Sequence, residues 1–243
     1  LVPFIISAFA NRPSEQENLV ELRKRYSSGN MALWPRPNID PSVSKGFVDI
    51  GVLPQVDYPA DNPYSKEKSL LGKLLVFDPR LSASKQISCA NCHDPQLGFG
   101  DGKSLAHGHG RREGKRNAMT LYNVAFYKSF MWDGRAKSLE DQVLLPTQDH
   151  VEMNTPLDTL VAHVREVAGY AAYFEKAFGH KKITLMRIQQ ALATFERGIV
   201  SYPTKFDRFV SGQSDALNDA ELTGLHLFRT KARCINCHNT PLF

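Results

Sequence analysis

Residues 89–93 read Cys-Ala-Asn-Cys-His, and residues 234–238 read Cys-Ile-Asn-Cys-His. These two segments contain all four cysteines of the 243-residue chain. In each copy, two thiols three residues apart can add to the vinyl groups of a haem, and the adjacent histidine reaches the iron from the same short helical turn. The pattern therefore predicts one covalent haem c at each copy. The predicted attachment residues are Cys89, Cys92, Cys234 and Cys237, and the predicted iron ligands are His93 and His238.

Three other uses of paired cysteines compete with this interpretation: a zinc site, a redox dithiol and a disulfide framework. Zinc sites built from two cysteine pairs usually space the pairs by about 15–20 residues, whereas 141 residues separate Cys92 from Cys234. A redox dithiol has no need of a following histidine, and both copies have one. Haem attachment accounts for both features. Because haem c is attached outside the cytoplasm, it also implies an exported protein.

The composition is ordinary for a globular protein, with 42% hydrophobic and 23% charged residues. The net charge is +5, and the isoelectric point is about 9.0. No run of Lys and Arg is interleaved with aromatic residues in the way that binding of a single strand requires. Nucleic acid is therefore not an expected partner.

The first ten residues are nearly all apolar and end in Ala8-Phe9-Ala10, which has the small-x-small form of a signal-peptidase site. We expect residues 1–10 to be the remnant of an export signal, which predicts a periplasmic protein. A buried N-terminal strand or a short anchor is the alternative. No other stretch approaches the roughly 20 apolar residues of a membrane span.

A weak internal repeat of helix, loop and haem motif occurs twice along the chain. Ser65 can cap a helix before the first motif. Asn218, with Glu221 three residues later, can start a helix before the second. Both helices contain a Gly-x-x-Leu segment, which begins at Gly72 in one and at Gly224 in the other.

Two amphipathic helices are predicted between the haem motifs, one starting at Thr155-Pro156 and one at Thr184. Their apolar residues recur three and four positions apart: Leu157, Leu160, Val161, Val164 and Val167 in the first, and Leu185, Ile188, Leu192, Phe195 and Ile199 in the second. A further helix is predicted at Pro13–Tyr26, within a Pro-rich extension. Because strand alternation is nearly absent, we expect a mostly α fold with two cytochrome c-like haem domains in tandem.

From about Asn62 to its end, the chain resembles the bacterial di-haem cytochrome c peroxidase family, which includes the MauG-like oxidases. The matching stretches are Leu71-Gly72, Asp78-Pro79-Arg80-Leu81-Ser82, Arg116-Asn117-Ala118, Trp132-Asp133-Gly134-Arg135-Ala136 and Glu152-Met153. They keep the family's order and rough spacing around both haem motifs. The extended region before Asn62 is more like that of the MauG-like branch.

The resemblance implies a division of the chain by function. The expected parts are the export-signal remnant at 1–10, an N-terminal extension at 11–61, a peroxidatic haem domain at 62–201 and the start of an electron-transfer haem domain at 202–243. Only five residues follow His238. The second domain is therefore expected to be incomplete, with the far-side ligand of its haem beyond Phe243.

The resemblance also implies roles for three residues near the first haem. Glu152 matches the family's distal acid, Gln142 its distal amide, and Trp132 the tryptophan between the haems. A carboxylate held over the iron can move a proton from the inner to the outer oxygen of peroxide, and an amide can orient the peroxide without titrating. Taken alone, Glu152 would be interpreted as a solvated loop carboxylate and Gln142 as a residue of a helix surface.

Further matches concern ions and haem contacts. Asn117 matches a ligand of a calcium ion between the haem domains, and an amide oxygen suits that ion. Arg116 is expected to pair with a haem propionate, because Arg forms forked hydrogen bonds with carboxylates. His109 matches the histidine that caps the peroxidatic iron at rest, and His107 competes for that role. An exposed loop that scavenges metals or contacts a propionate is the alternative.

Three functions remain open at this stage. The first is reduction of hydrogen peroxide to water, with electrons from a small cytochrome or cupredoxin that enter at the second haem. The second is a MauG-like oxidation of a residue on a partner protein. The third is electron transfer without catalysis, against which Glu152 and Gln142 argue. A homodimer is compatible with all three.

Mass spectrometry of the denatured protein tests the haem interpretation. We expect two haem additions, because thioether bonds survive denaturation. Finding one haem, or zinc in place of haem, would contradict the interpretation.

Overall fold

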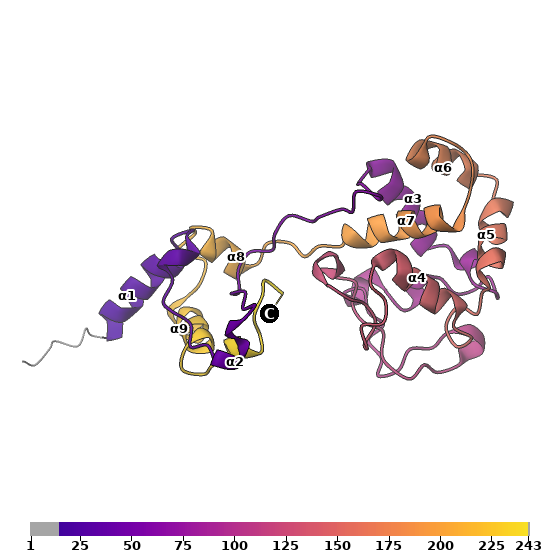
Figure 1. The fold of residues 1–243 in the computed structure, drawn as a ribbon. Helices are drawn as coiled ribbons and strands as arrows, with labels where there is room; N and C mark the ends of the chain where they lie inside the picture. The colour runs from indigo at the N-terminus through magenta and orange to yellow at the C-terminus, as the bar shows by residue number, and fades with distance from the viewer. Residues whose placement is uncertain (1–14, 243) are drawn as a thin grey trace, which may run out of the picture. The chain divides into compact units, whose positions relative to one another are not determined.

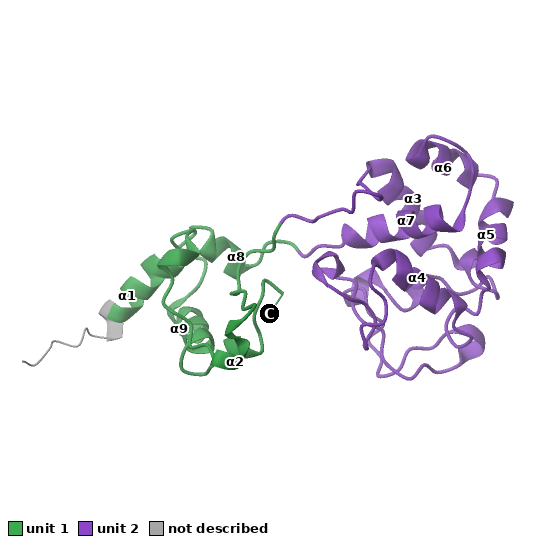
Figure 2. Cartoon of the chain, viewed as in Figure 1, with its two compact units in different colours: residues 1–54, 202–243 green, residues 55–201 purple. Residues whose placement is uncertain are grey.

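The chain forms two compact units in the computed structural model, which describes residues 15–242 (Figures 1 and 2). One unit combines residues up to Pro54 with those from Tyr202 onward, and the other runs from Gln55 to Ser201. The predicted export-signal remnant at 1–10 and the start of the helix predicted at Pro13 lie outside the described residues. The unit boundary after residue 201 coincides with the boundary expected from the sequence. The other unit boundary follows residue 54, whereas the sequence analysis placed it after residue 61.

Helices dominate both units, and the described residues contain no strand, only isolated bridges such as that between Asp94 and Gly100. The prediction of a mostly α fold is therefore confirmed. The α-helices are α1 (Glu15–Tyr26), α2 (Pro41–Ser44), α8 (Lys205–Val210) and α9 (Asp219–Arg229) in the first unit, and α3 (Lys66–Val76), α4 (Leu139–Gln148), α5 (Leu157–Glu166), α6 (Tyr170–Phe178) and α7 (Leu185–Arg197) in the second. None of the described helices combines the length and apolar character that crossing a membrane requires.

Side-chain caps start three of the predicted helices. Ser65 accepts a hydrogen bond from the Lys68 N–H at the start of α3. Thr184 caps α7, and Asn218 caps α9 in a reciprocal pair with Glu221. These side chains satisfy N–H groups that have no partner within the helix. The predicted starts of α3, α7 and α9 are confirmed.

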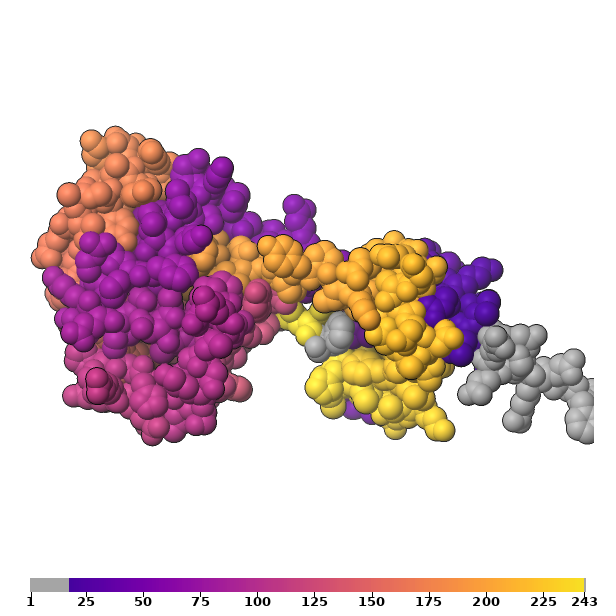
Figure 3. Space-filling model, turned by 180° about the vertical axis from the view of Figure 1, so that it is seen from behind, coloured from indigo at the N-terminus to yellow at the C-terminus, as the bar shows by residue number. Residues whose placement is uncertain are grey.

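The core of the 55–201 unit is built where α3 crosses α7. A Cβ atom on Gly72 would lie 2.7 Å from the Ala191 carbonyl carbon and 2.8 Å from Phe195 Cβ, so only glycine allows this approach. Buried side chains on both sides of the crossing, such as Leu75 and Ile188, join a single apolar cluster. Seen from behind, the side chains of this unit form a continuous packed surface (Figure 3).

A buried ion pair joins α4 to α7. The Arg197 guanidinium donates to both carboxylate oxygens of Glu140, at 2.7 and 2.8 Å. The Asn62 amide donates to the same carboxylate at 2.7 Å. Burial alone would raise the pKa of Glu140, but the hydrogen bonds from Arg197 and Asn62 outweigh it and hold that pKa below its usual value. Glu140 is therefore ionised, and both of its carboxylate oxygens accept hydrogen bonds.

Arg229 organises the other unit. This fully buried residue of α9 pairs with Asp49, donates to the Pro35 carbonyl oxygen at 2.8 Å, and lies over the rings of Tyr26 and Trp34. The second haem motif is tied to the same segment, because the Asn38 carbonyl oxygen accepts a hydrogen bond from the Asn236 side chain at 2.9 Å. Residues 15–54 therefore pack around α9 and the second motif.

Replacing Gly72 by alanine tests the α3–α7 crossing. The added methyl group meets backbone atoms that cannot move independently, so we expect a loss of stability of at least about 1–3 kcal/mol. Thermal unfolding of the haem-loaded protein, followed by circular dichroism, should show a lower Tm.

Gly224 on α9 provides the matched control, because it occupies the equivalent position of the repeat and a Cβ atom there meets nothing within 4 Å. Alanine has the higher helix propensity, so Gly224→Ala should be neutral or stabilising by up to about 1 kcal/mol. Equal losses in the two variants would show that the close approach at Gly72 is not what matters.

Candidate functional site

Both Cys-x-x-Cys-His motifs adopt the same local backbone. Each forms a short 3₁₀ turn, η3 (Cys89–Asn91) in one copy and η7 (Cys234–Asn236) in the other. The first cysteine's carbonyl accepts from the second cysteine's N–H at 3.1 Å and from the histidine's N–H at 2.9 Å, with the same two distances in both copies. All four thiols are free. Each motif therefore presents two unpaired thiols and an imidazole from one turn.

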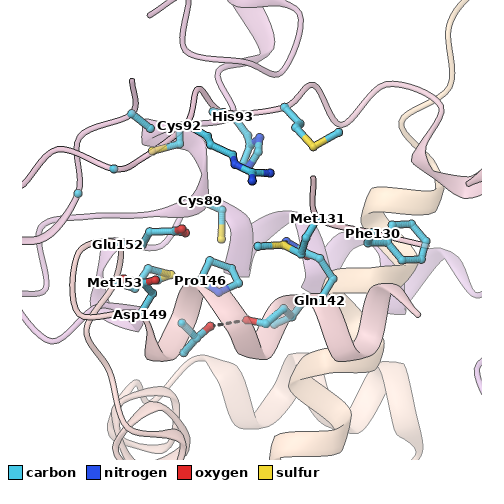
Figure 4. A pocket seen from close by; sticks show the side chains of 18 of the residues that line it. Cys89, Cys92, His93, Phe130, Met131, Gln142, Pro146, Asp149, Glu152 and Met153 are labelled. Atoms are coloured by element: carbon cyan, nitrogen blue, oxygen red, sulfur yellow. Dashed lines mark hydrogen bonds between the residues drawn. The ribbon is translucent and has the colours of Figure 1, made fainter. Parts of the chain in front are cut away.

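The first motif lines a cavity of about 610 Å³. This volume lies within the range of roughly 300–1,000 Å³ that is typical of small-molecule and cofactor sites. Figure 4 shows His93 and Cys92 on one side of the cavity and Gln142, Pro146 and Glu152 across from them. The cavity is thus flanked by the predicted iron ligand on one side and by the predicted distal residues on the other.

The ring of His93 is oriented by a hydrogen bond to a backbone carbonyl group. Its Nδ1 lies 3.1 Å from the carbonyl oxygen of Phe99, so Nδ1 carries the proton and donates it to that carbonyl. Nε2 is then left as the unprotonated nitrogen that can bind a metal. Burial lowers the pKa of His93, which favours the neutral ring that metal binding needs.

The Cys89 thiol differs from the reactive thiol of a redox dithiol. Burial, with a smaller effect of the Glu196 carboxyl, raises the pKa of Cys89 to about 12. A redox dithiol normally has a lowered thiol pKa, because the thiolate is the reactive form. Two free thiols, a neutral imidazole and a cavity of this volume fit a covalently attached haem.

The opposite wall comes from α4 and the turn that follows it. Gln142 lies on α4, with its amide nitrogen 3.8 Å from the sulfur of Met131. Glu152 lies in the turn, where its N–H donates to the Asp149 carbonyl oxygen at 3.1 Å. Burial, and to a lesser extent the charge of Asp149, raises the pKa of Glu152. Its carboxyl nevertheless stays accessible, because the cavity that it lines is open.

A backbone contact joins this turn to the loop that carries His107 and His109. The His109 N–H donates to the carbonyl oxygens of Val151 and Glu152, at 2.7 and 2.8 Å. A Cβ atom on Gly108 would lie 2.7 Å from Glu152 Cα, so glycine is needed for the loop to approach this closely. The position of Glu152 therefore depends on the docking of this loop.

Comparisons with known proteins show the family to which the chain belongs. A sequence profile for the di-haem cytochrome c peroxidases matches residues 66–215. The chain is 43% identical over 189 residues to the methylamine utilization protein MauG of Methylorubrum extorquens, covering 77% of this chain and 54% of that protein. It is 36% identical over 204 residues to the cytochrome c551 peroxidase of Nitrosomonas europaea, covering 82% and 61%.

The chain belongs to the di-haem cytochrome c peroxidase family. A crystal structure of a MauG-like protein associated with microbial copper homeostasis superposes with a TM-score of 0.67 and 30% identity, covering 72% of this chain and 52% of that one. The resemblance predicted from the sequence is thereby confirmed. The chain spans 54% and 61% of the length of the two relatives named above.

Most of the residues that the family resemblance singled out meet at the cavity. Gln142, Glu152, Trp132, Arg116 and Asn117 all line it, as does His107. The Trp132 ring is 54% exposed, and its Nε1 lies 3.5 Å from the Asn117 carbonyl oxygen. Among the described residues of the loop, the wall includes His107 and Gly108 but not His109, whose Nδ1 is buried without a hydrogen-bond partner.

The second motif is more open than the first. Cys234 and Cys237 are exposed, and the ring of His238 packs at 6.4 Å from the ring of Phe228. The thiols of this motif are therefore accessible for haem attachment.

Among the polar residues of the cavity that sequence analysis missed is Glu196 on α7. A signal was present, because Glu196 falls four positions after Leu192 and eight after Ile188, on the apolar stripe of the helix. A carboxylate at a core position is unusual unless it is paired or functional.

Gly108→Ala tests whether the loop docks on the acid-bearing turn. The added methyl group should push the loop away, because it would collide with the backbone of Val151 and Glu152. Amide hydrogen exchange at His109 should then become at least about tenfold faster, the equivalent of losing a hydrogen bond worth about 1.4 kcal/mol. Gly110→Asn is the control, since asparagine tolerates the left-handed backbone at that position and a Cβ atom there meets nothing within 4 Å. Unchanged exchange in Gly108→Ala would contradict the docking.

Proposed function

We propose that this protein is an exported di-haem peroxidase, which reduces hydrogen peroxide to water with electrons from a small cytochrome or cupredoxin. The observation that supports the proposal is the cavity at the first motif, where Glu152 and Gln142 lie across from His93. The overall reaction consumes two electrons and two protons for each peroxide: H₂O₂ + 2H⁺ + 2e⁻ → 2H₂O. Bound haem would supply the iron at which peroxide is reduced.

Glu152 is proposed as the acid and base of the reaction. In its ionised form, the carboxylate accepts the proton of the inner peroxide oxygen and returns it to the outer oxygen as the oxygen–oxygen bond breaks. Burial suits this role, since a carboxylate with a raised pKa is a stronger base than an ordinary solvated carboxylate and accepts the peroxide proton more readily. The amide of Gln142 orients the peroxide from α4 and stays neutral at every pH.

The remaining predicted residues are assigned by position. Arg116 and Asn117 line the cavity. Arg116 is proposed to pair with a propionate, and Asn117 to bind a calcium ion. Trp132 is proposed as an aromatic stepping point for electrons from the haem at His238.

His109 is proposed as the resting cap of the first haem, with His107 as its competitor. Because its N–H is bonded to the acid-bearing turn and its ring is not part of the described cavity wall, capping by His109 requires the loop to rearrange. Electron paramagnetic resonance of the resting ferric protein tests the cap: a high-spin haem would show that neither histidine binds the iron.

Oxidation of a partner protein, in the MauG-like manner, is the second candidate function. Two observations favour it: the 43% identity to a MauG protein and the likeness to a solved MauG-like structure. The two functions differ in their reductant. Catalytic turnover with a small reduced donor supports the peroxidase, whereas peroxide oxidation of both haems without such turnover supports the second function.

Glu152→Gln tests the acid–base role. The amide keeps the size of the carboxyl but cannot accept a proton, so peroxide turnover should fall by about 10²–10⁴-fold with both haems still attached. In the unaltered protein, turnover should be lost as the pH falls through the raised pKa of Glu152, because only the ionised form is a base. Glu175→Gln, at an exposed carboxylate that pairs with Lys181, is the control and should retain full activity. A change of less than about threefold in Glu152→Gln would remove Glu152 from the mechanism, since it falls short of the usual acid–base contribution.

A further inference from the structure

Glu196 is a buried carboxyl that faces the cavity without a partner. Only 5% of its surface is exposed, yet it belongs to the cavity wall. Its Oε2 atom is buried and has no hydrogen-bond partner. Asp78, a buried carboxylate of the same unit, accepts hydrogen bonds from Arg80 and from the Tyr170 hydroxyl instead. A carboxyl that only filled the core would be expected to be paired in the same way.

The charged groups around Glu196 leave it uncompensated. Arg197 is its neighbour in sequence, but that guanidinium already donates to both oxygens of Glu140. Glu140 adds a negative charge nearby, and the Cys89 thiol faces Glu196 from the haem motif. Burial raises the pKa of Glu196 to about 8, with Arg197 lowering it and Glu140 raising it by smaller amounts.

The stoichiometry of peroxide reduction requires a proton source of this kind. In the proposed reaction Glu152 returns the proton that it takes, so it supplies no net proton. The two protons consumed with the two electrons must therefore reach the cavity by another route. An electron added to a buried site disfavours a neighbouring negative charge, and proton uptake by a carboxylate removes that charge.

We propose that Glu196 is the redox-linked proton-binding residue of this cavity, which takes up a proton when the first haem gains an electron and releases it when that haem is oxidised. The inference rests on the proposed haem at Cys89, Cys92 and His93. Glu196 can supply one of the two protons that each peroxide consumes, as its carboxylic acid O–H breaks and a carboxylate remains. Reduction for the next cycle restores the acid.

The pH dependence of the reduction potential tests this role directly. Spectroelectrochemical titration of the haem-loaded protein, resolved into its two waves, would be repeated on both sides of about pH 8. Proton uptake coupled to a one-electron reduction lowers the midpoint potential by up to about 59 mV per pH unit. We expect one wave of the unaltered protein to approach this slope, and the same wave of Glu196→Gln to be independent of pH.

Glu152→Gln is the matched control, because it removes the other carboxyl with a raised pKa from the same cavity. It should keep the slope of the unaltered protein. A slope that persists in Glu196→Gln, or that disappears in Glu152→Gln instead, overturns the assignment.

Infrared difference spectra keep the test decisive if Glu196→Gln does not fold. Reduction of the unaltered protein should produce a protonated-carboxyl band that shifts when glutamate is labelled with ¹³C, and absence of this band overturns the inference.

Peroxide turnover is measured separately on the same preparation. Turnover without the pH-dependent wave refutes the role of Glu196 alone, whereas the wave without turnover refutes the peroxidase and leaves the proton linkage intact.

Discussion

The buried ion pair between Glu140 and Arg197 holds together the two helices on which the cavity depends. α4 carries Gln142 and leads into the turn of Glu152, while α7 carries Glu196 beside Arg197. Both oxygens of Glu140 accept from the guanidinium, and Asn62 adds a further donor. Removing one partner from a buried pair typically costs about 3–5 kcal/mol, because the other charge is left uncompensated. This pair therefore fixes the distal wall relative to the helix behind it.

The same pair explains why two neighbouring carboxyls of this unit, Glu140 and Glu196, behave differently. Glu140 accepts hydrogen bonds from Arg197 and Asn62 and stays ionised, whereas Glu196, one residue before Arg197, receives none from either. Environments that push the pKa values of nearby carboxyls apart are typical of sites that handle protons. Glu152, bonded through its backbone and open to the cavity, lies between these extremes.

The loop that carries His107 and His109 adds a steric constraint to the electrostatic effect of the Glu140–Arg197 pair. It contacts the turn of Glu152 through backbone atoms, and Gly108 allows the approach because it has no side chain. Withdrawal of this loop would therefore break the hydrogen bonds from the His109 N–H to the turn of Glu152. The position of Glu152 is thus coupled to the docking of the loop.

The sequence by itself determined the haem chemistry, the helical class and several helix starts, because each depends on residues close together in the chain. The Cys-x-x-Cys-His spacing is complete within one turn, and caps such as Ser65 act on N–H groups three residues away. The family resemblance then pointed to Glu152 and Gln142, which do line the cavity.

Only the tertiary structure revealed Glu196, the docking of Gly108 and the packing of residues 15–54 around α9. The physical reason is common to these cases. Each feature depends on groups that are distant in sequence: the hydrogen-bond partners of a carboxyl, the backbone beside a glycine, or the helix on which a segment packs. These groups come together only when the chain folds, so their contacts cannot be inferred from neighbouring residues.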